Sequence, residues 1–259
     1  MLQLKNVRKT FNAGTVNEKK ALTGVNLVLE DGDFATIVGS NGAGKSTMFN
    51  AIAGSFYPDR GSIILDGKNI TFVPEYRRSV YIGRLFQDPL MGTAPHMTIE
   101  ENLAIAYLRA SKKQHAIFSR ISKKEKEFFR EQLALLGMGM EDRMKNPVGL
   151  LSGGQRQALT LLMATMVTPR ILLLDEHTAA LDPKSSENVM ELTDRIIKEK
   201  KLSAIMVTHN LRFAVEYGTR LLMMDKGQCV IDSGFDGKAN YKIDDLLHTF
   251  NQISIECGN

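Results

Sequence analysis

The stretch GSNGAGKST, residues 39–47, decides the fold of this chain. It follows the apolar run FATIV (34–38) and precedes MFNAIAG (48–54), which is compatible with a helix. A glycine-rich loop between a buried strand and a helix is typical of phosphate binding, because it presents free backbone N–H groups. The alternative is a glycine-rich turn that carries a lysine by chance.

The spacing within this stretch favours phosphate binding. Gly39 is followed by four residues and then by Gly44, Lys45 and Ser46, which is the P-loop pattern. The glycines allow the backbone to approach phosphate oxygens, and a helix that begins near Lys45 points its positive end at them. We expect Lys45 to contact the β- and γ-phosphates and the Ser46 hydroxyl to bind Mg²⁺. The predicted phosphate-binding residues are Gly39, Ser40, Asn41, Gly42, Ala43, Gly44, Lys45, Ser46 and Thr47.

A second predicted site comes from the stretch ILLLDE, residues 171–176. The apolar part reads as a strand covered on both faces, and it places Asp175 at the carboxyl end, where ligands bind in open α/β sheets. Asp175 is expected to orient Mg²⁺, and the adjacent Glu176 to polarise an attacking water. The alternative is a strand that ends in two solvated acids.

A third motif, LLSGGQ (150–155), predicts another helix start. Ser152 is a good N-cap, and Gly153 and Gly154 leave backbone N–H groups uncovered. One triphosphate does not need two such helix ends from the same chain. We therefore expect this one to serve an ATP that is bound by another copy; the alternative is an ordinary capped helix.

Composition limits the remaining possibilities. The chain has 259 residues, 43% of them hydrophobic and 24% charged, as in ordinary globular proteins. A net charge of +4 is too weak to predict nucleic acid as a partner. Two cysteines form no metal motif, and no apolar run approaches the ~20 residues of a membrane helix. We expect a cytosolic protein that reaches a membrane only through a partner.

Taken in order, these motifs resemble those of the ATP-binding-cassette (ABC) ATPases. GSNGAGKST looks like the Walker A motif, LSGGQ like the signature and ILLLDE like Walker B. Gln87 matches the Q-loop, Asp182 ends a D-loop, and His209 matches the switch histidine. The segments KTFNAGTVNEKKAL, FQDPLMGT, MTIEENLA, GGQRQALTLLMA and DEHTAALDP resemble ATPase subunits of the tryptophan/tyrosine-type bacterial uptake branch.

The resemblance implies an α/β fold: a P-loop NTPase core with an antiparallel β-subdomain and an inserted helical subdomain. It implies a core over about 1–87 and 156–235, a helical subdomain over about 88–155, and a C-terminal helix or tail over 236–259. From the residues themselves, Asp66-Gly67 predicts a hairpin turn, and Thr98 with Glu101 a capping box.

The resemblance to the ABC ATPases also implies roles for individual residues. The catalytic residues would be Glu176, His209 and Gln87, and the Mg²⁺ ligands Ser46, Gln87 and Asp175. Phe11 would stack on the adenine, and the cross-dimer contact to ATP would come from Ser152, Gly153, Gly154 and Gln155. The cofactors are ATP and Mg²⁺.

The expected partners are a second copy of the chain, a transmembrane permease and a substrate-binding protein. The function would be the ATP-hydrolysing subunit of a bacterial importer of amino acids or related small molecules, on the inner face of the cell membrane. An apolar patch beside Gln87, formed by Leu90, Met91 and Met97, is predicted to dock a permease helix. The alternative is a soluble ABC ATPase of the iron–sulfur assembly type; a nucleotide sensor without hydrolysis is disfavoured by Glu176 and His209.

Three features stay open at this point. His177 stands where the family usually has proline; it either titrates near neutral pH and biases Glu176, or is a tolerated turn residue. The basic segment 109–130 either lies near anionic lipid or forms a solvated helix face. The predicted helix 242–250 in the tail either docks on the core or has a regulatory role.

Overall fold

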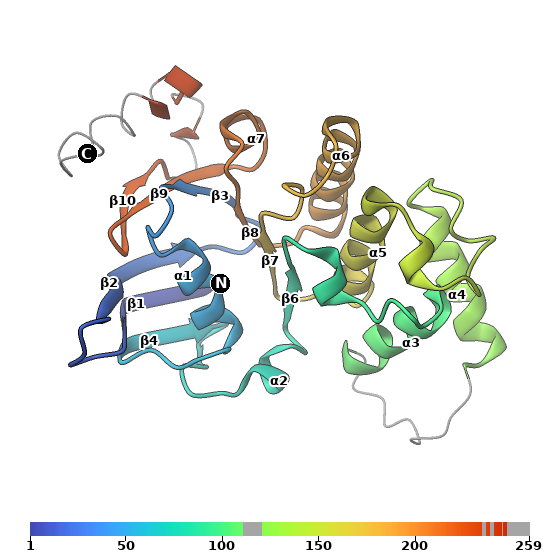
Figure 1. The fold of residues 1–259 in the computed structure, drawn as a ribbon, viewed down its shortest axis with the longest axis horizontal. Helices are drawn as coiled ribbons and strands as arrows, with labels where there is room; N and C mark the ends of the chain where they lie inside the picture. Colours follow the sequence, from blue (N-terminus) through green and yellow to red (C-terminus); the bar gives the residue numbers. More distant parts are fainter. Residues whose placement is uncertain (111–120, 235–236, 239–240, 245, 248–259) are drawn as a thin grey trace. The chain divides into compact units, whose positions relative to one another are not determined.

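The computed structural model describes residues 1–110, 121–234, 237–238, 241–244 and 246–247 (Figure 1). The chain divides into two compact units. Unit 1 is formed by Met1–Arg78 and Leu202–Asn259, and unit 2 by Ser79–Lys201. The predicted helix 242–250 lies partly outside the described residues.

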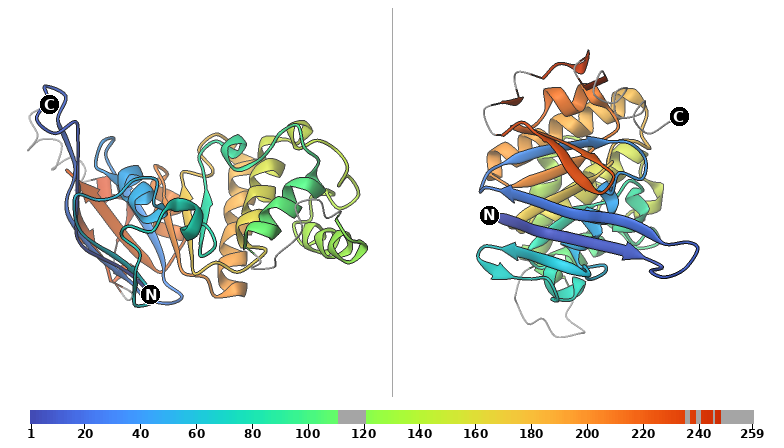
Figure 2. Two further views of the ribbon diagram at one scale, coloured as in Figure 1. Left: turned by 90° about the horizontal axis from the view of Figure 1, so that it is seen from below. Right: turned by 90° about the vertical axis from the view of Figure 1, so that its left-hand side faces the viewer.

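An antiparallel sheet occupies the N-terminal part of unit 1. Its order is β2 (Lys19–Leu29), β1 (Leu2–Phe11), β4 (Arg60–Leu65) and β5 (Lys68–Asn69). Figure 2 shows the two long strands β1 and β2, in blue, running beside one another. The hairpin predicted between β4 and β5 is confirmed: Asp66 and Gly67 have φ angles of 49° and 75°, as a type I′ turn requires.

A second sheet of unit 1 carries the glycine loop. Its strands are ordered β10 (Gln228–Asp232), β9 (Arg220–Asp225), β3 (Phe34–Gly39) and β8 (Ala204–Val207), and β3 is parallel to both of its neighbours. Every residue of β3 is buried, which explains its unbroken apolar sequence. Among its described residues, the unit also contains the helices α1 (Lys45–Ala53), α2 (Glu75–Arg78) and α7 (Leu211–Glu216), and helical residues at 243–244 and 246–247.

The C-terminal end of α1 is held by a buried arginine that the sequence did not single out. Arg78 is 1% exposed, and its Nη1 donates to the carbonyl oxygens of Ala51 and Ile52, each at 2.8 Å. Its Nε and Nη2 donate to Val73 and Thr71. Because the last carbonyls of a helix lack partners within the helix, this one side chain satisfies two of them and adds a favourable charge.

Unit 2 combines a parallel strand pair with helices. The strands β6 (Ile82–Leu85) and β7 (Ile171–Asp175) pair in register, with Leu85 opposite Leu174. The helices are α3 (Ile99–Ala110), α4 (Lys123–Ala134), α5 (Gly153–Thr165) and α6 (Pro183–Lys200), with 3-10 turns η1 (Pro89–Gly92) and η2 (Val148–Leu150). The capping box at the start of α3 is confirmed: Glu101 Oε2 accepts from Thr98 N at 2.7 Å, and Thr98 Oγ1 accepts from Glu101 N at 3.3 Å.

Helix α5 is the centre of unit 2. It packs against α3, α4, α6 and β6, and most of its residues are buried (Figure 1).

The two sheets and the helices of both units confirm the predicted α/β fold with an antiparallel sheet and a set of helices. Within the described residues, no helix is both long and apolar enough to cross a membrane.

Candidate nucleotide-binding site

The glycine loop of unit 1 is closed in by backbone at both ends. Gly39 has φ 156°, and a Cβ there would lie 2.3 Å from the carbonyl oxygen of Met224 in β9. Gly44 has φ 102°, and a Cβ there would lie 2.6 Å from the carbonyl oxygen of Ala21 in β2. No side chain fits at either position, so the two glycines are required by close approach and by backbone conformation.

Lys45 lies on this loop with its ammonium group directed at the loop backbone. The side chain is buried, and Nζ donates to the carbonyl oxygens of Gly39 at 2.7 Å and Ser40 at 3.0 Å. Ser40, Asn41, Gly42 and Ser46 are exposed. The loop therefore combines a fixed positive charge with accessible backbone and hydroxyl groups, which is the chemistry that binds a polyphosphate.

His209 follows the strand next to the loop-bearing strand. The register places Ile37 of β3 opposite Val207 of β8, and Thr208 N donates to Ile37 O at 3.1 Å. The segment after β8 therefore begins at the same sheet edge as the glycine loop, and the side chain of His209 is exposed there. His209 therefore stands two residues after the end of β8, as a side chain accessible from solvent.

Phe11 ends β1 with a half-buried ring. The ring makes an edge-to-face contact with Phe56, with centroids 5.4 Å apart. Lys9 Nζ lies 5.6 Å from the Phe11 centroid and 2.8 Å from Asp59 Oδ1. The aromatic contact and the cation hold the Phe11 ring in one place, as an adenine-stacking residue would require.

Two carboxylates and a glutamine end the parallel strands of unit 2. Asp175 is the last residue of β7, Glu176 follows it, and Gln87 lies two residues beyond β6. Because Leu85 pairs with Leu174, these strand ends lie at one edge of the pair. Asp175 and Glu176 are half-buried and Gln87 is exposed, so oxygen ligands and a potential base are gathered within this unit.

Arg84 is a residue of this edge that the sequence prediction missed. Its Nη2 lies 3.7 Å from Asp175 Oδ2, and its guanidinium lies 4.5 Å from the centre of the Phe86 ring. The signal in the sequence was one charged residue inside the apolar strand YIGRLF (81–86). This ion pair links the end of β6 to the end of β7.

The surroundings of His177 exclude one of the two interpretations offered for it. The side chain is 1% exposed, and its Nε2 lies 3.2 Å from Thr193 Oγ1 of α6. Burial lowers the pKa of His177 to about 4, because a buried cation loses its hydration. Of the two alternatives, titration near neutral pH is therefore excluded, and the structure favours the tolerated turn residue, with a neutral side chain packed against Thr193.

The LSGGQ segment forms the predicted N-cap. Ser152 Oγ accepts from Gln155 N at 3.3 Å, and Gln155 Oε1 accepts from Ser152 N at 3.2 Å, which is a complete capping box at the start of α5. A Cβ on Gly153 would lie 3.0 Å from Leu181, and one on Gly154 would lie 3.2 Å from Ser185. The two glycines thus let the start of α5 approach the segment that begins α6.

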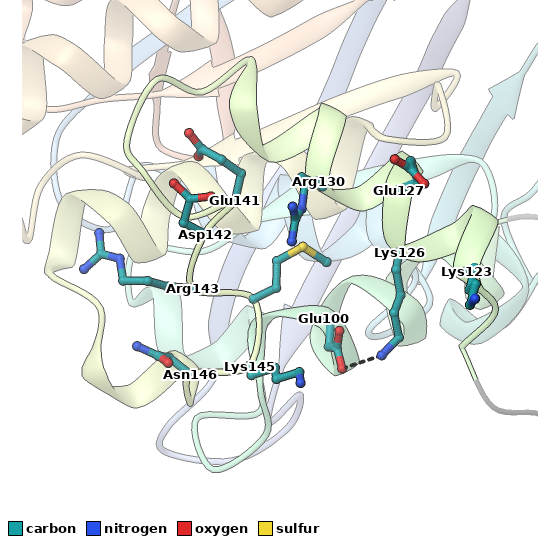
Figure 3. Close-up of a pocket in the computed structure, with 11 residues that line it drawn as sticks. Glu100, Lys123, Lys126, Glu127, Arg130, Glu141, Asp142, Arg143, Lys145 and Asn146 are labelled. Carbon is teal, nitrogen blue, oxygen red and sulfur yellow. Dashed lines mark hydrogen bonds and ion pairs between the residues drawn. The ribbon is translucent and has the colours of Figure 1, made fainter.

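A separate pocket of about 500 Å³ lies in unit 2 between α3, α4 and the segment 141–146 (Figure 3). Its lining carries both charge signs, including the Lys126–Glu100 ion pair at 3.1 Å. None of the predicted nucleotide-site residues lines it.

The basic segment 109–130 is only partly described. Its Lys126 forms the ion pair with Glu100, whereas Lys112, Lys113 and Arg120 lie outside the described residues.

A buried parallel strand, a glycine loop and a helix that starts at a buried lysine define the class of P-loop nucleotide-binding proteins. The model of the ABC transporter family matches residues 22–179, more than half of the chain. The chain belongs to the ABC transporter family, as one of its ATP-binding ATPases. The predicted ATPase activity and the use of ATP are thereby confirmed.

Individual relatives support the same assignment. The chain is 41% identical over 250 residues to the tyrosine transport ATP-binding protein of Clostridioides difficile, spanning 96% of this chain and 98% of that protein. It is 31% identical over 264 residues to the phosphonates import ATP-binding protein PhnC of Treponema denticola, spanning 100% and 98%. Among solved structures, the dimeric cassette MJ0796 bound to ADP and Pi superposes with a TM-score of 0.76 at 29% identity, covering 90% of this chain and 97% of that one.

Proposed function

We propose that this chain is the ATP-hydrolysing subunit of a bacterial importer of amino acids or related small molecules. The observation that carries the proposal is the identity of 41% across nearly the whole of both chains to a protein named for tyrosine transport. The phosphonate relative has lower identity at similar coverage. The transported molecule itself would contact other subunits, so only its class is proposed.

In this proposal the glycine loop and Lys45 bind the ATP phosphates, and Phe11 stacks on the adenine. Ser46, Gln87 and Asp175 would hold Mg²⁺. All three offer oxygen donors, which is the ligand type that Mg²⁺ prefers, and Arg84 Nη2 lies 3.7 Å from Asp175 Oδ2. When bound, Mg²⁺ neutralises charge on the phosphates.

Hydrolysis would depend on Glu176 and His209. Glu176 orients the attacking water and accepts its proton as the oxygen bonds to the γ-phosphorus, and ADP leaves with the electron pair of the broken P–O bond. His209 contacts the γ-phosphate region, and Gln87 senses this group and couples it to the membrane partner. The exposed His209 side chain and the half-buried Glu176 are accessible enough for these roles.

The active form would be a head-to-tail dimer. Each copy would give its glycine loop to one ATP and Ser152, Gly153, Gly154 and Gln155 to the other. The chain holds one glycine loop and one LSGGQ, and the related MJ0796 cassette is a dimer. ATP would hold the copies together because each nucleotide is bound from both sides, and hydrolysis would release them.

A permease and a substrate-binding protein would complete the importer, with this chain at the inner face of the membrane. Leu90 is 41% exposed and Met91 is 69% exposed, beside Gln87. These two side chains would receive a helix of the permease.

We also propose a functional division of the chain. It comprises a core over about 1–87 and 156–235, a helical subdomain over about 88–155 and a tail over 236–259.

The decisive experiment uses Glu176→Gln, which keeps the shape of the side chain but cannot accept the proton. Light scattering at high protein concentration with Mg²⁺ should show a dimer with ATP and a monomer without it. The matched control is Glu199→Gln, an exposed acid on α6, which should hydrolyse ATP like the parent. If the molar mass of Glu176→Gln is the same with and without ATP, the dimer mechanism is wrong.

The alternative of a soluble ABC ATPase is tested by membrane association. The parent protein should co-purify with a permease from detergent-extracted membranes. If it is recovered alone in the soluble fraction when its permease is co-expressed, the importer proposal fails and the soluble ATPase takes its place.

A further inference from the structure

We propose that Lys238 and Leu246, from the segment that follows β10, form a clamp on α7 and thereby position His209 for hydrolysis. The inference rests on the proposed role of His209 and extends it to two residues outside the motifs. It concerns unit 1 alone, since Lys238, Leu246, α7 and His209 all belong to it.

Lys238 holds the C-terminal end of α7. Its side chain is 7% exposed, and Nζ donates to the carbonyl oxygens of Tyr217 and, at 3.3 Å, Gly218. These carbonyls directly follow the helix, where backbone acceptors lack helical partners. Burial lowers the pKa of Lys238 to about 8, so the group is still largely protonated at neutral pH.

The same ammonium reaches the loop-bearing strand. Lys238 Nζ lies 3.4 Å from Thr36 Oγ1, and Thr36 Oγ1 in turn donates to Ala214 O of α7 at 2.9 Å. Thr36 is fully buried and stands three residues before Gly39. A buried hydrogen-bonded network of this kind fixes its members relative to one another, because breaking one bond leaves polar groups unsatisfied.

Leu246 packs against α7 through a buried apolar cluster. It is fully buried in a cluster with Val38, Ala214, Leu221 and Met223. Val38 directly precedes Gly39, and Ala214 is on α7. Leu246 therefore packs the helix against the strand that bears the glycine loop, with the apolar burial of a full leucine side chain.

Helix α7 transmits this constraint to His209. Asn210 caps the helix by accepting from Phe213 N at 3.2 Å, and its own N donates to Thr208 Oγ1 at 3.0 Å. His209 lies between Thr208 and Asn210, the two residues joined by the second of these hydrogen bonds. Because α7 is held at its C-terminal end and along its buried side, the backbone position of His209 at its N-terminal end is also fixed.

The proposal predicts a specific kinetic effect. Lys238→Met removes the ammonium but retains an unbranched chain, and Leu246→Ala removes the packing. Each should lower kcat by about 10-fold, because a misplaced catalytic group loses rate steeply with distance. The KM for ATP and the ATP-binding stoichiometry should stay close to the parent values, because the glycine loop is unchanged. Lys238→Arg should recover much of the rate, and Leu247→Ala, at a neighbouring position 45% exposed, should behave as the parent.

A double-mutant cycle separates positioning from general loss of structure. Single-turnover hydrolysis of radiolabelled ATP should be compared in the parent and in a His209→Ala background. The two clamp substitutions should have little further effect once His209 is absent, because they act through it.

The outcomes are distinguishable. If His209→Ala lowers kcat and the clamp substitutions lower it by the same factor in both backgrounds, the clamp does not act through His209 and the inference is wrong while the proposed function stands. If His209→Ala leaves kcat unchanged, the catalytic role proposed for His209 fails and the inference fails with it. A loss of binding stoichiometry in Lys238→Met and Leu246→Ala would show general unfolding and would also overturn the inference.

Discussion

His177 Nε2 lies 3.2 Å from Thr193 Oγ1, in a contact that is fully enclosed by protein. Because burial lowers the pKa of His177 to about 4, below its usual 6.5, the unfolded chain binds a proton at this residue more readily than the folded chain does. The contribution of neutral His177 to the free energy of unfolding is therefore fully present above about pH 6.5. It decreases as the pH falls towards 4. Urea unfolding of the parent and of His177→Asn, measured between pH 7 and 4, should show the steeper loss in the parent.

The control for this experiment is the difference between the two proteins at neutral pH. His177→Asn should be less stable at neutral pH, since it loses ring packing. The difference in free energy of unfolding between the two proteins should become smaller as the pH falls. A gap that is constant with pH would contradict the low pKa of the buried imidazole.

Substitution of Arg78 should destabilise unit 1. Arg78→Met would leave the buried carbonyl oxygens of Ala51, Ile52 and Thr71, and the partly buried one of Val73, without this donor. An unsatisfied buried acceptor costs about 1–3 kcal/mol, so we expect a loss of at least about 3 kcal/mol. Thermal or urea unfolding gives the value. The neighbouring exposed residue provides the control, since Arg77→Met should change stability by less than about 0.5 kcal/mol.

Removal of the Lys45 ammonium should weaken nucleotide binding. Lys45→Ala should lower ATP affinity by about 10- to 100-fold, the range expected for the loss of charge-assisted hydrogen bonds to phosphate. Isothermal titration calorimetry measures this directly. Lys20→Ala, an exposed lysine of unit 1, should bind ATP as the parent does. Equal ATP affinity in Lys45→Ala and the parent would exclude the glycine loop as the phosphate site.

A charge at the exposed apolar pair beside Gln87 should separate transport from hydrolysis. Leu90→Glu and Met91→Glu should release the chain from its permease and stop uptake, because a buried carboxylate in an apolar contact is strongly unfavourable. ATPase activity of the isolated subunit should remain. Leu135→Glu, at another exposed leucine (66%), should leave uptake intact. Joint loss of uptake and isolated ATPase in the Leu90 and Met91 variants would show that the pair is internal packing.

Local signals in the sequence sufficed for several elements. The β3 strand, the Asp66-Gly67 turn, the Thr98–Glu101 box and the Ser152 cap each depend on a few neighbouring residues with strong conformational preferences. The β3 strand is buried on all sides, so its apolar run is distinctive, and the P-loop spacing is specific to its chemistry.

Contacts between distant residues could not be predicted in the same way. Arg78 satisfies carbonyls 26 and 27 positions earlier in the chain, and Lys238 contacts Thr36 from 202 positions away. No local pattern marks either residue as buried. The two alternatives for His177 could not be separated from the sequence for a related reason: its pKa depends on burial against Thr193, which the turn sequence DEHTA does not reveal.

The order of segments in unit 1 has a consequence for synthesis on the ribosome. Strand β3 is made early, but its neighbours β8 and β9 belong to the segment that begins at Leu202, after the whole of unit 2. At about 5–20 residues per second, a strand whose side chains are apolar except for Thr36 stays unpaired for on the order of ten seconds. Unit 2 is continuous in the chain and is available to fold during that interval. Nascent chains arrested before residue 202 should therefore engage hydrophobic-binding chaperones through residues 34–39.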